Sequence, residues 1–208
     1  MARDEGRANV NVLQLTMWHM TADSETGTEY EDTKHTFPDQ LNSFSYQPSM
    51  QIATQYGDGK KVEDYAVKDG GTCNAVIRAF ADGDEMFLFG ESSLSSPSGD
   101  GTGKLYTTVS NNKDIVPYCC VAYATRRSDG LYNLYKFPRV KWLSQGETNN
   151  QQEGTTIQFG TASLSGNYSP LQSNGDDKYK VIGVDAVKDK EFWDNWFDDP
   201  KFIQTQTV

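Results

Sequence analysis

The stretch IVPYCCVAYAT, residues 115–125, and the stretch LYNLYKFPRVKW, residues 131–142, decide the fold. Both are rich in β-branched and aromatic residues, which favour strands. Asp129-Gly130 lies between them and is typical of a two-residue type I′ turn. The sequence therefore predicts an antiparallel hairpin with a type I′ turn.

A third strand is expected from Ile157 onward. Ile157 and Phe159 share one face at a period of two, whereas Ala162 and Leu164 continue on the opposite parity. The apolar phase therefore slips by one residue at Gly160. A β-bulge at this glycine would restore one continuous buried face, and the alternative is that one strand ends here and another begins.

Further strands are expected upstream of the hairpin. They cover residues 10–20, 37–46 and 71–80, and Pro48 is expected to end the second of them. Residues 51–71 are polar and punctuated by glycine. This composition is typical either of a solvated loop or of a projecting hairpin.

Two other segments depart from the strand pattern. Asp82 or Asp84 can cap a helix whose buried side is MFLF, residues 86–89, although such a short apolar run also suits a strand. Residues 92–103, SSLSSPSGDGTG, have the composition of a flexible loop.

Several blocks of the sequence carry a family resemblance. They are KDIVPY (113–118), RRSDG (126–130), YNLYKF (132–137) and IQFGTA (157–162), with looser matches at PDQL (38–41), YQP (46–48), YGDG (56–59) and WF (196–197). Their order and spacing resemble the major tail tube protein of bacteriophages with long, non-contractile tails, the siphophage major tail protein family. The resemblance covers residues 41–197, and residues 113–164 match best.

The resemblance implies a fold and a function. The fold would be mainly β, a single tail tube domain over residues 1–208, with a two-sheet β-sandwich and one flanking α-helix. Copies would form hexameric rings in which the inner sheets close a barrel. Stacked rings would form a tail tube that conducts double-stranded DNA from capsid to host without binding it specifically.

The resemblance also implies partners and a location. Besides further copies of the chain, the partners would be the tape measure protein and tail terminator or baseplate proteins. The protein would be a structural part of the virion, made in the host cytoplasm, and would contact no membrane. No enzymatic activity, cofactor or metal is expected.

Two segments are candidates for contacts between subunits. Residues 51–71 resemble a projecting loop of the family, which would reach an adjacent subunit. The aromatic segment 191–203 has large side chains at i,i+4 spacing, which can dock on the chain's own core or on a neighbour. The candidate interface residues are Tyr56, Gly57, Asp58, Gly59, Glu63, Tyr65, Trp193, Trp196 and Phe197.

The charge of the chain limits what it can bind. The formal net charge is −10, from 29 acids and 19 bases, which argues against the basic surface of a protein that holds nucleic acid. An acidic wall would instead repel phosphates. Acids are therefore expected to face the lumen of a tube.

The residue types of common catalytic and metal sites do not converge. Cys119 and Cys120 are adjacent in a strand and point to opposite faces, so they are expected to be small apolar fillers. His19 and His35 are the only histidines, and no cysteine spacing joins them in a zinc site.

The sequence also argues against nucleotide binding, glycosidase activity and a membrane role. Residues 99–104 lack the first glycine and the hydroxyl residue of a phosphate-binding loop. Glu147 and Glu153 lie in a turn-like segment and are expected to be solvated acids rather than a glycosidase pair. No apolar window is long enough to span a bilayer, and residues 1–12 do not resemble a signal peptide.

Two alternative functions remain open at this stage. The first is the tube of a phage-like bacteriocin or secretion system, which carries no genome. The second is a carbohydrate-binding β-sandwich that would use exposed Trp142 or Trp193. Glycan binding by a monomer would favour the second.

Overall fold

The structure is a computed structural model, and it describes residues 7–58, 60–81, 83–94, 107–148 and 160–202. The chain is mainly β, as expected. The strands are β1 (Asn9–Ser24), β2 (Gly27–Tyr30), β3 (His35–Phe37), β4 (Leu41–Gly57), β5 (Lys60–Ile77), β6 (Ser92–Leu94), β7 (Thr107–Val109), β8 (Tyr118–Arg127), β9 (Tyr132–Thr148), β10 (Thr161–Tyr168) and β11 (Tyr179–Val184). The helices are α1 (Asp84–Phe89) and α2 (Lys190–Asp198).

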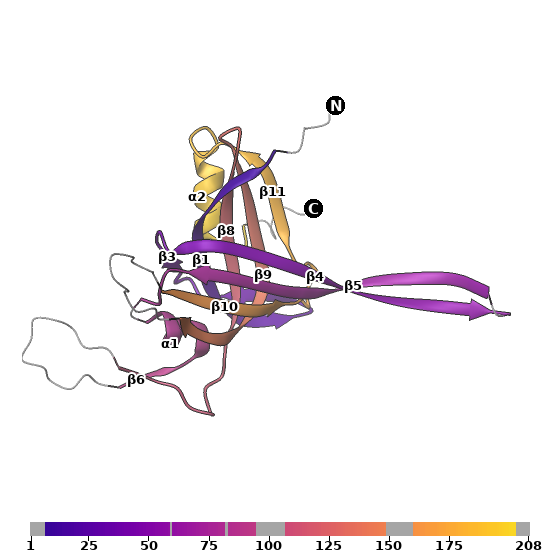
Figure 1. The fold of residues 1–208 in the computed structure, drawn as a ribbon, viewed down its shortest axis with the longest axis horizontal. Coiled ribbons are helices and arrows are strands. Elements are labelled where there is room, and N and C mark those ends of the chain that lie inside the picture. Colours follow the sequence, from indigo (N-terminus) through magenta and orange to yellow (C-terminus); the bar gives the residue numbers. More distant parts are fainter. Residues whose placement is uncertain (1–6, 59, 82, 95–106, 149–159, 203–208) are drawn as a thin grey trace, which may run out of the picture.

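One antiparallel sheet contains nine of these strands (Figure 1). Its order is β2-β1-β8-β9-β10-β5-β4, with β3 also pairing β1 and β11 also pairing β9. β6 and β7 form a separate two-stranded ribbon. The structure thus has a continuous sheet that is not closed, where the family resemblance implied two sheets.

The hairpin of β8 and β9 is confirmed, but the predicted type I′ turn is wrong. A type I′ turn needs positive φ at both central residues, and here only Gly130 has it, with φ of 87°. The Arg127 amide donates to the Leu131 carbonyl at 2.8 Å, so residues 128–130 form a three-residue loop. The Asp129 carboxylate accepts from the Leu131 amide at 3.2 Å, which stabilises this alternative.

The segment predicted as strand 37–46 is divided differently. β3 ends at Phe37, and β4 begins at Leu41 and continues through Pro48 to Gly57. Pro48 is tolerated inside β4 because β4 is the edge strand, where one side of the backbone has no sheet partner. Residues 41–77 therefore form one long hairpin.

The predicted bulge at Gly160 cannot be placed, because residues 149–159 lie outside the described chain. β10 begins directly after Gly160, at Thr161. Ala162 and Leu164 are buried on the same face, as the alternation predicted.

β8 is buried on both faces. Cys119, Val121 and Tyr123 belong to one apolar cluster, and Cys120 and Ala122 belong to another. The prediction that the two cysteines pack on opposite sides is therefore confirmed. A strand buried on both sides needs a layer over each face.

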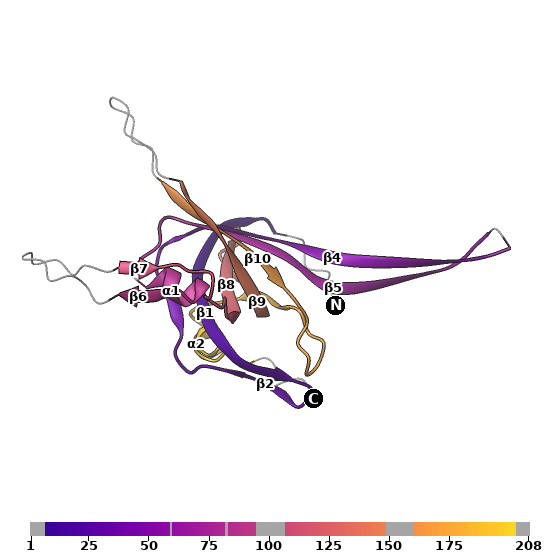
Figure 2. The ribbon, with the colours of Figure 1, turned by 90° about the horizontal axis from the view of Figure 1, so that it is seen from below.

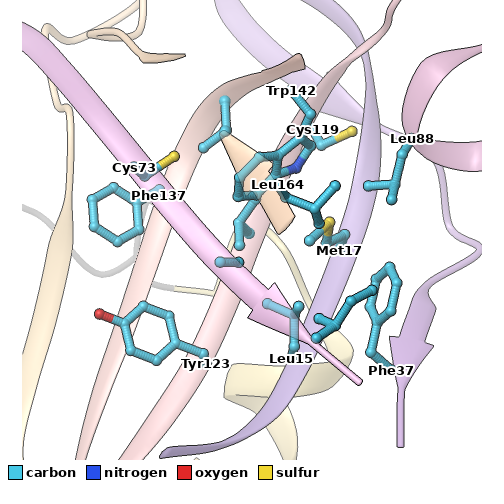
Figure 3. Packing of buried hydrophobic residues seen from close by; sticks show 14 of the residues in the cluster. Leu15, Met17, Phe37, Cys73, Leu88, Cys119, Tyr123, Phe137, Trp142 and Leu164 are labelled. Carbon is cyan, nitrogen blue, oxygen red and sulfur yellow. The ribbon is translucent and has the colours of Figure 1, made fainter. Parts of the chain in front are cut away.

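The first layer comes from the sheet itself, which folds over so that β4 lies opposite β8 and β9. The Phe44 ring stacks on Tyr123 at 4.2 Å between centroids and lies 5.8 Å from Phe137. Figure 3 shows Tyr123 and Phe137 together with Trp142 and Leu164 in this cluster. Burying each large aromatic side chain contributes about 2 to 3 kcal/mol.

The second layer is α2, which packs on the other face of the β1–β8–β9 region (Figure 1). Trp196 and Phe197 of α2 join Trp18 of β1 and Leu134 of β9 in the second cluster. α2 is longer than α1, so the expectation of a single flanking helix is wrong. Among the described residues, no helix has the length and apolar character to cross a bilayer.

α1 is confirmed as a helix, but its predicted cap differs. Asp82 lies outside the described chain, and Gly83 is the N-cap residue with no side-chain cap hydrogen bond. The buried Asp84 carboxylate instead accepts from the Ala81 amide and from His35 Nε2, both at 2.7 Å. These bonds attach the start of the helix to β3.

A lysine lies between the sheet and α2. Lys136 of β9 is fully buried, and its Nζ donates to the Asp199 carbonyl at 2.7 Å. Its Nζ also lies 4.9 Å from the Trp196 ring centroid and 5.6 Å from that of Trp18. Lys136 therefore caps the carboxyl end of α2, where a positive charge interacts favourably with the helix dipole.

The lysine gives a pH-dependent prediction. Burial lowers the pKa of Lys136 below its ordinary value of 10.5. Between the folded and unfolded pKa values the unfolded chain binds more protons, so the stability contributed by Lys136 rises with pH in that window. Relative to Lys136→Met, the wild type should gain up to about 1.4 kcal/mol of unfolding free energy per pH unit there.

Urea unfolding of both proteins at several pH values from neutral to 10.5 measures this difference. Subtracting the unfolding free energy of the variant from that of the wild type at each pH removes the contribution of all titrating groups that the two proteins share. A difference that stays constant over the whole range would contradict the account of Lys136.

Candidate assembly interface

The outer part of the β4–β5 hairpin projects from the body of the molecule. We call residues 49–69 the arm. Figures 1 and 2 show it extending away from the rest of the sheet in two perpendicular views. Every arm residue whose burial is described is exposed. Of the two predicted possibilities for residues 51–71, the structure has the projecting hairpin.

Two glycines mark the place where the arm leaves the body. A Cβ on Gly71 would lie 2.2 Å from the Gln47 carbonyl oxygen, and one on Gly70 would lie 2.0 Å from that of Tyr168. Gly70 also has a φ of 63°. The register between β4 and β5 shifts here, between Pro48 and Met50. Only glycine permits this close approach, so the position of the arm is fixed at its base.

The arm is held together by its own cross-strand pairs. Thr54 lies opposite Asp64 and donates a hydrogen bond to it at 2.8 Å, and Lys61 forms an ion pair with the same carboxylate. These bonds, the one from Lys61 first, hold the pKa of Asp64 below its usual value. A two-stranded ribbon in water is only marginally stable by itself. Docking on another surface would therefore stabilise the arm.

Both faces of the arm carry apolar side chains. Ile52 pairs with Ala66 on one face, and Ala53 pairs with Tyr65 on the other. The exposed fractions of its large apolar residues range from 44 to 69%. These residues are Met50, Ile52, Tyr56, Val62, Tyr65 and Val67. Such a concentration of exposed apolar side chains is typical of an interaction surface.

The edge of the sheet lies along the same element. β4 ends the strand order, so one side of its backbone has no partner within the described part of the chain. Unpaired edges are a template for pairing with another strand. The arm and the β4 edge together form the candidate assembly interface.

The sequence-predicted interface residues fall into two separate groups. Tyr56, Glu63 and Tyr65 are exposed on the arm, and Asp58 lies at its tip with a φ of 50°. Gly57 is the last residue of β4. Gly59 lies outside the described residues.

The C-terminal group lies on α2, on the body of the molecule. Trp196 is 0% exposed and Phe197 is 2% exposed, because the chain's own sheet covers them. Trp193 is half-buried, and its ring lies edge-on against Tyr132 at 4.9 Å. Of the three, Trp193 offers the most surface to a neighbour.

The expectation of an exposed Trp142 is wrong, because this side chain is 0% exposed. Trp142 lies opposite Gly166 of β10, and a Cβ on that glycine would lie 2.8 Å from the Trp142 ring. Because Gly166 has no side chain, the Trp142 indole has room to pack inward. Trp142 is therefore no platform for a sugar.

Some functional features were missed from the sequence alone. The sequence did not decide between a loop and a hairpin for residues 51–71, although Met50, Ile52, Thr54 and Tyr56 alternate at a strand period. The predicted flexible loop 92–103 lies mainly outside the described residues, apart from β6. Its flexibility stays a prediction.

Comparison with known proteins yields a likeness to solved structures but none to a family or a curated protein. No protein family matches the sequence, and no curated protein matches it. The chain is similar to a chain in a cryo-EM structure of the anti-feeding prophage baseplate, six-fold symmetrised, with 7% identity and a TM-score of 0.37. The match covers 85% of this chain and 97% of the other.

Proposed function

We propose that this protein is a structural protein of a phage or phage-like tail, in which copies assemble into hexameric rings that stack as a tail tube. The observation that carries the proposal is the arm, a long hairpin with exposed apolar side chains on both faces. The resemblance of residues 113–164 to siphophage major tail proteins supports it from the sequence.

The energetics of the arm favour docking on another copy. Each large apolar side chain that leaves water contributes about 1.5 to 3 kcal/mol, and the arm offers six of them. The arm of one copy would lie on the body of the next. This is a head-to-tail contact, which closes into a ring when its rotation allows.

The β4 edge supplies a second contact in the proposed ring. Neighbouring copies would place their sheets edge to edge, so that the rings contain a continuous barrel. Closing a barrel removes the unpaired edges that an isolated sheet leaves in water. The proposed role of the protein is mechanical, since the tube conducts DNA and makes or breaks no bond.

Photo-cross-linking tests the proposed contact. A benzophenone amino acid in place of Tyr65 on the arm is expected to give covalent oligomers, with a ladder up to the closed ring. The same group in place of Lys188, an exposed residue just before α2, serves as the matched control and should leave mostly monomer. Equal yields at the two positions, or no cross-linked copies from Tyr65, would contradict the proposed interface.

A further inference from the structure

One broad sheet face is not covered by any of the described residues and carries short, uncharged polar side chains. It lies on β4, β5 and β10, on the side opposite Phe44 and Leu164. Two cross-strand rows in direct register define this polar face, namely Ser45, Asn74 and Ser165 in one row and Gln47, Thr72 and Asn167 in the other. Ser165 is half-buried and the other five are exposed.

The polar face is the outer side of the layer that folds over β8. The inner side of that layer belongs to the first apolar cluster, which includes Ala75 and Leu164. The β1–β8–β9 region is covered on its far face by α2. The subunit thus has two opposite outer sides, the polar face and the α2 side.

These two sides differ in charge. The six residues of the polar face include no charged group, and the adjoining row of Ser43, Val76 and Ser163 has none either. On the α2 side, residues 185–199 contain six acids and two bases. The net charge of −10 is therefore distributed unevenly over the molecule.

The two rows of the polar face continue onto β9, one with Lys141 and the other with the exposed Leu143. Lys141 of β9 lies opposite Asn167, at the end of one row. Its Nζ lies 5.1 Å from the centroid of the Tyr118 ring, where a cation–π contact stabilises it. One lysine per copy, already engaged by the Tyr118 ring, provides few ionic contacts for a phosphate backbone.

We infer that the polar face lines the bore of the tube and that its partner there is double-stranded DNA in transit. The inference rests on the proposed function. The acid-rich α2 side would then face outward, away from the polyanion. This replaces the acidic lining expected from the net charge, and an uncharged wall would neither hold phosphates nor repel them.

The physical reason is that an uncharged polar surface exerts no long-range electrostatic force on DNA and offers it only hydrogen bonds that water can replace. Exposed charges act over about 8 Å at physiological salt, so an acid-rich lining would oppose entry of DNA and a basic one would retain it. Hydroxyl and amide groups exchange their hydrogen bonds with water at little net cost. DNA should therefore pass such a surface without a bound state.

The buried native cysteines permit a selective label. Cys73, Cys119 and Cys120 are fully buried, and burial raises the pKa of the Cys73 and Cys120 thiols to about 12. An introduced Asn74→Cys is then the reactive thiol of the polar face. Lys188→Cys provides the matched thiol on the α2 side, and Ser165→Cys is a second position on the polar face.

The experiment is electron microscopy of assembled tubes labelled with maleimide-undecagold. Gold on the tube axis for Asn74→Cys or Ser165→Cys, and on the outer wall for Lys188→Cys, is the expected result. Gold outside the wall for both polar-face variants would overturn the inference while leaving the proposed tube intact. If the unmodified protein forms no tubes, the proposed function itself fails, and the inference falls with it.

Discussion

Shortening the arm is expected to abolish assembly while the subunit remains fully folded. In the variant, residues 52–66 are replaced by Asn-Gly, which joins Gln51 to Val67, a directly opposed pair in the hairpin. The removed residues with described burial are all exposed and belong to neither apolar cluster. The melting temperature should therefore stay near that of the wild type.

The effect on assembly should be large. The variant loses Ile52, Tyr56, Val62 and Tyr65, and two such side chains alone account for at least about 3 kcal/mol of docking free energy. The concentration needed for assembly should rise about 100-fold or more. Sedimentation velocity over a concentration series measures this change, and thermal unfolding monitors the fold.

A matched control keeps the arm and changes only polar side chains. Gln55 and Glu63 lie opposite each other on the arm, and replacing both by Ala leaves its length and apolar residues intact. This control should assemble like the wild type. Normal assembly by the shortened variant would show that the arm is not the interface.

Replacing Trp196 by Ala is expected to lower the free energy of unfolding by about 3 to 5 kcal/mol. Trp196 is fully buried between α2 and the sheet, and its ring lies beneath the ammonium of Lys136. The substitution would leave a cavity in the second cluster. Urea unfolding of the isolated subunit measures the loss, and assembly should weaken only as the folded fraction falls.

Trp193→Ala is the companion variant for this prediction. Trp193 is half-buried beside Tyr132, so its loss should cost about 1 to 2 kcal/mol. If Trp196→Ala abolished assembly without changing the unfolding midpoint, α2 would have to dock on a neighbouring copy. That outcome would contradict the packing described above.

Features that depend on alternation in one strand could be predicted from the sequence. The hairpin over residues 115–142 and the opposite directions of Cys119 and Cys120 follow from a period of two. The single continuous sheet could not be predicted in the same way. It depends on β10 pairing with both β9 and β5, which are far apart in the sequence.

The positions of residues that the sequence misjudged, Pro48 and Trp142, and of Lys136, for which it made no prediction, have tertiary causes. Pro48 continues β4 because its strand lies at the edge of the sheet, and Trp142 is buried because Gly166 leaves space beside it. Lys136 occupies a core position because the end of α2 supplies a carbonyl for its ammonium. In each case the decisive partner is distant in the sequence.

The arm could also be predicted only in part, because its strands have a local sequence pattern but its projection from the body has none. Its strand period is visible in residues 50–56, but a hairpin that packs against nothing in the described part of its own chain has no signal that separates it from a solvated loop. The structure distinguishes the two. The exposed apolar side chains then give the arm its proposed role.

Negative-stain electron microscopy of the purified, unmodified protein at high concentration tests the central claim most directly. The account predicts rings with six-fold symmetry, and tubes of stacked rings with a central channel. A monodisperse monomer at every concentration, with neither rings nor tubes, would contradict it.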